Sequence, residues 1–122
     1  MAIVKNIKKQ AKDNSFFRKV LETGKFTQVV IMSIPPGGEI GEEIHDDTDQ
    51  VLCLAEGEGQ VILEGEISEY AEHDLVLVPA GTKHNFVNNG KEDLKIITMY
   101  SPPHHPPGTV HKTKAEADKA EY

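Results

Sequence analysis

The stretch GGEIGEEIHDDTDQVLCLAEG, residues 37–57, decides the fold and raises the question of function. It runs from a glycine-rich turn into a mixed polar and apolar segment, then into VLCL, an apolar run typical of a strand. Glu43 and His45 lie two residues apart in its polar half. Residues two apart in a strand point to the same face, so these two side chains are expected to converge. The segment is therefore either a polar loop or part of a metal site.

Short apolar runs of the same kind, separated by Gly, Pro, Asn and Asp clusters, fill most of the chain and predict an all-β domain. The predicted strands are residues 17–22, 26–34, 39–45, 50–55, 60–63, 66–70, 75–78, 84–87 and 94–101. So many short strands at regular spacing indicate a sandwich or a barrel. We therefore expect one domain over residues 1–122, with a barrel at about 15–101.

Both ends of the chain lie outside these strands. Residues 5–12 could form a short amphipathic helix, and Thr113 with Glu116 has the spacing of a capping box that opens a terminal helix. Between the last strand and this box, SPPHHPPG (residues 101–108) is too rich in proline to pair in a sheet. We expect residues 1–12 and 102–122 to be appendages of the barrel.

Composition limits the partners and the compartment. The chain has 122 residues, with 13 Lys and Arg against 20 Asp and Glu, giving a formal net charge of −7. This charge disfavours nucleic acid and anionic membranes as partners. No signal peptide or transmembrane stretch is visible, and Cys53 has no second cysteine for a disulfide. These features predict a cytoplasmic protein.

Several strands are apolar on both faces, among them VVIM (29–32), VLCL (51–54) and LVLV (75–78). A two-layer sheet protein needs only alternate residues inside, so a second apolar face calls for another layer or subunit. The alternative is that these side chains are merely scattered on the surface, because most protein surfaces are partly apolar. We favour a homodimer with Val51 or Cys53 near the interface.

Two further residues can join Glu43 and His45. Gln50 opens the next strand and can face them across a short turn, and His84 opens a later strand after the turn PAGTK. Imidazole nitrogen with carboxylate and amide oxygen suits Zn, Mn, Fe or Ni better than Ca or Mg. Taken singly, a strand histidine is usually just hydrogen-bonded and an acidic run is a solvated face. The spacing of all four residues taken together is what favours a site for one divalent transition metal over these simpler interpretations.

These spacings resemble the first of the two motifs of the cupins. That motif is Gly, five residues, His-x-His, three or four residues, Glu, six residues, Gly. This chain matches every spacing with Gly37, Glu43, His45, Gln50 and Gly57.

The second cupin motif is Gly, five residues, Pro-x-Gly, two residues, His, three residues, Asn. This chain again matches every spacing, with His73, Pro79, Gly81, His84 and Asn88. The resemblance implies a jelly-roll β-barrel. More narrowly, the segments around both motifs and the stretch YSPPHHPPGTVHKTKA resemble those of small single-domain bacterial cupins, which are often called sugar-isomerase-like.

Three positions depart from the family pattern. Glu43 replaces the first His, Gln50 replaces the usual Glu, and His73 replaces a Gly. The first two changes compensate, so the formal charge of the ligand set stays at −1, which favours a retained metal site. Neutral Gln50 cannot act as a base, which leaves Glu43 as the motif carboxylate able to move a proton. His73 lies in a turn, where His tolerates positive φ, and is interpreted as structural.

Two classes of function remain open. In the first, the metal site is catalytic and acts on a small oxygenated molecule, either as a sugar isomerase or epimerase with Glu43 as base or as an Fe-dependent dioxygenase. In the second, the barrel binds metal or a small molecule without turnover. Arg18 is the sole arginine, so a phosphorylated substrate lacks an arginine cluster.

The tail histidines His104, His105 and His111 are not included in the ligand set. They could supplement a metal site or form a lid, but we expect them to be surface residues of an extended segment, because histidines in loops are ordinary.

Overall fold

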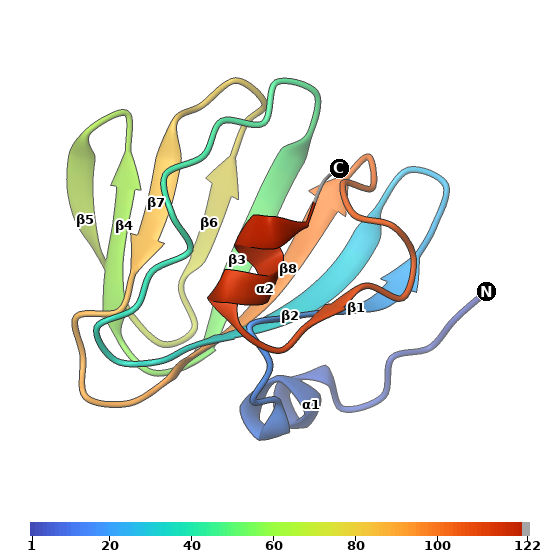
Figure 1. The fold of residues 1–122 in the computed structure, drawn as a ribbon, viewed down its shortest axis with the longest axis horizontal. Coiled ribbons are helices and arrows are strands. Elements are labelled where there is room, and N and C mark those ends of the chain that lie inside the picture. The colour runs from blue at the N-terminus through green and yellow to red at the C-terminus, as the bar shows by residue number, and fades with distance from the viewer. Residues whose placement is uncertain (121–122) are drawn as a thin grey trace.

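The computed structural model describes residues 1–120 as nine strands with one short helix near each end (Figure 1). The elements are α1 (Ile7–Asp13), β1 (Arg18–Thr23), β2 (Gln28–Ile34), β3 (Asp49–Glu56), β4 (Gly59–Leu63), β5 (Glu66–Tyr70), β6 (Leu75–Val78), β7 (His84–Val87), β8 (Leu94–Ser101), β9 (Val110–His111) and α2 (Lys114–Lys119). Neither helix of the described chain has the length and apolar character needed to span a membrane.

The strands form two sheets that face each other. One sheet has the order β6-β3-β8-β2-β1-β9 and the other the order β5-β4-β7, and every pairing within them is antiparallel. Figure 1 shows the smaller sheet standing beside the larger one, with the chain passing between them repeatedly. This arrangement confirms the predicted all-β jelly roll.

The core lies between the two sheets and is built from alternate residues of both. Its largest fully buried side chains include Leu52 and Ile96 from the larger sheet and Phe86 from the smaller one. Tyr70 packs edge-on against Phe86, with ring centres 5.2 Å apart. The space between the sheets is therefore filled by apolar side chains around Tyr70 and Phe86.

The chain itself covers part of the outer face of the larger sheet. Ala11 of α1 packs with Ile31 and Ala55 into a second, smaller cluster, with Leu21 and Ile97 at its edge. This contact explains why β2 is apolar in both parities. It does not reach β6, where Leu75 and Leu77 stay 61% and 56% exposed.

The predicted strand at residues 39–45 was wrong. The chain there touches the smaller sheet at two isolated bridges, Glu39 with Val87 and Glu43 with His84. Gly41, between them, has φ +107°, a conformation outside the strand region, and its N–H donates to the side chain of Asn85. The segment is therefore a strap pinned at two points.

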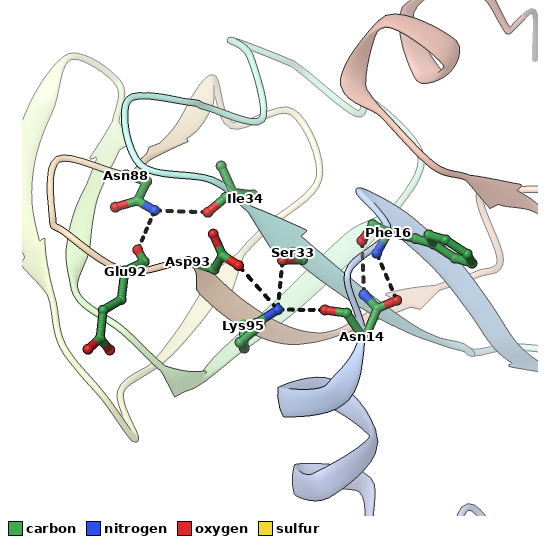
Figure 2. A network of polar contacts seen from close by, with 8 residues as sticks. All are labelled: Asn14, Phe16, Ser33, Ile34, Asn88, Glu92, Asp93 and Lys95. Carbon is green, nitrogen blue, oxygen red and sulfur yellow. Dashed lines mark hydrogen bonds and ion pairs between the residues drawn. The ribbon is translucent and has the colours of Figure 1, made fainter.

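A buried lysine holds the larger sheet to the turn after α1 (Figure 2). Lys95 is 8% exposed, and its Nζ donates to the Asn14 carbonyl at 2.6 Å and to Ser33 Oγ at 3.0 Å, with Asp93 Oδ2 3.5 Å away. These contacts satisfy the ammonium group inside the protein. Nearby, Asn88 donates to the carbonyls of Ile34 and Glu92, both at 2.8 Å, and fixes the chain after β7.

The C-terminal segment returns to the barrel. β9 pairs with β1, with His111 opposite Arg18, and α2 follows it. The predicted capping box is confirmed, because Thr113 Oγ1 accepts from the Glu116 N–H and the Glu116 side chain accepts from the Thr113 N–H, both at 3.2 Å. His73 has φ +75°, as its turn position predicted.

Candidate functional site

The strap brings Glu43 beside His84. Each residue donates its backbone N–H to the carbonyl of the other at 2.9 Å, so the two form a directly opposed antiparallel pair. Side chains of such a pair project from the same face. The structure therefore places these two predicted site residues next to each other at the end of β7.

His45 lies against both of them. Its Nε2 is 3.1 Å from Glu43 Oε2, and its ring centre is 5.3 Å from that of His84. Its backbone is fixed by Gly81, whose N–H donates to the His45 carbonyl at 2.7 Å. The imidazole is almost fully buried, whereas the Glu43 side chain is one-third exposed. Three of the four predicted residues are thus neighbours, with His45 in contact with Glu43 and near the ring of His84.

The surroundings keep Glu43 ionised. Burial acts to raise the pKa of this carboxyl, but the hydrogen bond and charge of His45, with the charges of Arg18 and His84, outweigh burial and lower it. Glu43 is therefore a carboxylate at neutral pH, able to bind a cation.

The tautomer of His84 is set by its neighbour. Its Nδ1 is 2.8 Å from the carbonyl of Thr82, which can only accept, so Nδ1 carries the hydrogen. In the neutral ring Nε2 then has a free lone pair. This backbone contact is the kind that orients metal-binding histidines. His84 is 3% exposed, so its ring is held firmly.

Gln50 is buried on the inner face of β3. Its Nε2 donates to Thr98 Oγ1 at 3.0 Å, and its Oε1 is a buried acceptor without a hydrogen-bond partner among residues 1–120. In the sheet it stands directly opposite Tyr100, which in turn stands opposite Gln28. Because a buried acceptor without a donor is destabilising, the unused Oε1 is consistent with a ligand position.

The expectation that the tail histidines lie on the surface was wrong. His105 is 6% and His111 7% exposed, and the ring of His104 lies 4.3 Å from that of His45, centre to centre. His104 also stacks on Tyr100 at 5.6 Å with 20° between the planes. Burial and the nearby charge of His45 lower the pKa of His104 against the opposing effect of Glu43 and Asp47. The tail therefore delivers an imidazole to the site.

Gln28 holds the tail in this position. Its Oε1 accepts from the N–H groups of His104 and His105 at 3.2 and 3.1 Å, and its Nε2 donates to the His105 carbonyl at 2.7 Å. Gln28 is fully buried. A glutamine directly before the apolar run of β2 was the one sequence signal for this clamp. Its partner, 77 residues away, could not be identified from the sequence.

The donor set fits a transition metal in chemistry, although its side chains are not gathered around one point. Within the described chain, no three His, Cys, Asp or Glu side chains form a group that could hold a metal ion as they stand. Two donors on one metal at bond lengths of about 2.1 Å lie roughly 3.0–3.4 Å apart. The 3.1 Å between Glu43 Oε2 and His45 Nε2 lies in this range. Gln50 Oε1, which has no hydrogen-bond partner among residues 1–120, is a further available donor.

A search of protein families matches the cupin domain family over residues 30–100. A crystal structure of BH2720 from Bacillus halodurans has a TM-score of 0.96 and 43% identity, covering 98% of this chain and 96% of that one. The uncharacterized protein YrkC of Bacillus subtilis is 42% identical over 97% of this chain and 67% of its own length. A mannose-1-phosphate guanylyltransferase of Salmonella montevideo is 28% identical over 66% of this chain, which matches 17% of that enzyme.

Proposed function

Because the chain belongs to the cupin family, we propose that it binds one divalent transition metal through Glu43, His45, Gln50 and His84 and acts on a small oxygenated molecule. The observation that carries the proposal is the 3.1 Å contact of Glu43 with His45, directly beside His84, whose Nδ1 is held by the Thr82 carbonyl so that Nε2 is the nitrogen that can bind a metal. An ionised carboxylate next to two imidazoles is a ligand group for Zn, Mn, Fe or Ni.

The reaction we propose is a proton transfer of the isomerase or epimerase type. A bound metal would polarise an oxygen of the substrate as a Lewis acid. Glu43 would accept the proton, because neutral Gln50 cannot and because Glu43 is ionised and one-third exposed. The similarity to part of a mannose-1-phosphate guanylyltransferase supports a sugar-sized, oxygen-rich ligand.

The other residues of the site would position and shield the reaction. The carbonyl of Thr82 orients His84, and Gln28 holds the segment that presses His104 against His45. Packing of this kind fixes the donors and limits the access of water. The tail therefore belongs to the site, although it is remote from it in sequence.

Metal binding by substituted proteins tests the proposal. Metal-free wild-type protein is titrated with Zn²⁺ or Mn²⁺ against a competing chromophoric chelator, together with the single variants His45→Ala and His84→Ala. We expect one ion per wild-type chain and loss of most binding in both variants. His73→Asn is the matched control, because His73 is an exposed turn histidine at positive φ, which Asn also tolerates.

Two outcomes decide the test. Full binding by the His73 variant with loss in the other two supports the site. Stoichiometric metal in either the His45 or the His84 variant would show that the metal is held elsewhere.

A further inference from the structure

A pocket of about 310 Å³ opens beside the candidate site, lined by Arg18, Glu43, His104 and residues of α2. Its volume is in the range of small-molecule sites. The pocket lies where the strap, β1 and the C-terminal segment meet, and Figure 1 shows α2 lying in front of the larger sheet.

Arg18 is a buried cation in the wall of this pocket. It is 6% exposed, its Nη1 lies 3.2 Å from His111 Nδ1, and its Cζ lies 5.2 Å from the ring centre of Phe17. Burial and the charge of Arg18 lower the pKa of His111 against the effect of Glu116, so the imidazole accepts as a neutral group. His111 therefore orients the guanidinium but brings no negative charge to it, and the nearby Glu43 carboxylate acts on Arg18 through its charge without forming an ion pair with it within residues 1–120.

The acidic side chains around the pocket already have nitrogen partners, which are lysines for two of them. Glu42 pairs with Lys83 at 3.2 Å, Asp118 with Lys114 at 2.8 Å, and Glu43 contacts His45. Among the ion pairs of residues 1–120, none includes Arg18, and its Nε has no acceptor there. A buried charge of this kind is strongly destabilising unless something pairs with it.

We propose that Arg18 binds the carboxylate of a small hydroxy or oxo acid whose other oxygen atoms reach Glu43, His45 and His84. One planar guanidinium forms a fork that matches one carboxylate. Glu43 and Arg18 line the same pocket, so one small molecule can touch both. This inference names the substrate class of the proposed function. Only the contacts of the ligand with Glu43, His45 and His84 rest on that function, and the contact with Arg18 does not.

The test compares lactate with lactamide, which has nearly the same shape and lacks the charge. Binding to wild-type protein is measured by ligand-observed NMR and calorimetry, with and without added Zn²⁺, in a buffer free of carboxylate and phosphate. We expect lactate to bind more tightly than lactamide. Arg18→Gln should weaken lactate binding by roughly 10- to 150-fold, the factor expected for a charge-assisted hydrogen bond, and leave lactamide unchanged.

Lys19→Gln is the matched control, because Lys19 is the next residue of the same strand and is exposed on the opposite face. Lys19→Gln removes the same charge from outside the pocket, so this variant should still bind lactate more tightly than lactamide, as the wild type does. Arg18→Lys should restore part of the preference, and thermal unfolding identifies variants that are still folded. If Arg18→Gln is unfolded, the comparison of Arg18→Lys with wild type decides in its place.

The failure of this inference is distinct from that of the metal site. A preference for lactate that depends on Arg18 in metal-free protein upholds the inference even if no metal binds. Equal binding of lactate and lactamide by wild-type protein, or an unchanged preference after substitution of Arg18, overturns it and leaves the metal titration unaffected.

Discussion

Removal of the Gln28 side chain should release the tail from the barrel. The amide makes four hydrogen bonds, two as donor to Thr23 and to the His105 carbonyl and two as acceptor from His104 and His105. Each contributes about 1 kcal/mol net, and Gln28→Ala also leaves a cavity. We therefore expect a loss of about 3–5 kcal/mol in the free energy of unfolding, from hydrogen bonding and packing together.

Urea unfolding followed by circular dichroism measures this loss, and hydrogen exchange should rise at the amides of His104 and His105 because both lose their acceptor. Gln10→Ala is the control, since Gln10 makes one exposed hydrogen bond, to the Lys5 carbonyl, and should change stability by less than about 0.5 kcal/mol. A loss below about 1 kcal/mol for Gln28→Ala, with unchanged exchange, would refute the clamp.

Three further predictions concern the buried lysine, the exposed sheet face and the tail histidine. Lys95→Met should lower the free energy of unfolding by about 1–3 kcal/mol by leaving buried acceptors unsatisfied, whereas exposed Lys91→Met should not; equal losses would contradict this. We propose a homodimer through the β6 face, so light scattering should show a dimer that Leu77→Glu dissociates and Ile67→Glu, equally exposed on the other sheet, does not; a monomeric wild type would contradict it. His104→Ala should weaken metal binding by about 10- to 100-fold, because the His104 ring packs against that of His45 and helps to hold it in place. An unchanged metal affinity would show that His104 only fills space beside the site.

The sequence predicted the fold because both motifs and the strand pattern carry local information. Turn residues such as Gly57 and Gly81 and apolar runs such as 51–54 define strands and their ends without reference to distant parts of the chain. The strap was predicted as a strand because polar and apolar residues alternate along it, as they do in a strand with one buried face. Its pairing is limited to two bridges, and pairing depends on the partner rather than on the segment.

Part of the candidate site was predicted because its residues belong to the two motifs, whose spacing is local information. Glu43, His45 and His84 meet as their spacing indicated, since the strap and β7 are tied by backbone hydrogen bonds. The contributions of His104 and Arg18 depend on contacts between segments more than 50 residues apart, such as the 93-residue separation of Arg18 and His111. A proline-rich segment gives no periodic signal, so its burial could not be read from the pattern.

The proposed metal site can be located in a crystal that is soaked in Mn²⁺ or Zn²⁺ and measured at the absorption edge of that metal. We expect one anomalous peak within about 2.0–2.3 Å of Glu43, His45, His84 and Gln50 Oε1, with the donors drawn together around it. A peak held by the tail histidines alone, or no peak in a crystal soaked with excess metal, would contradict it.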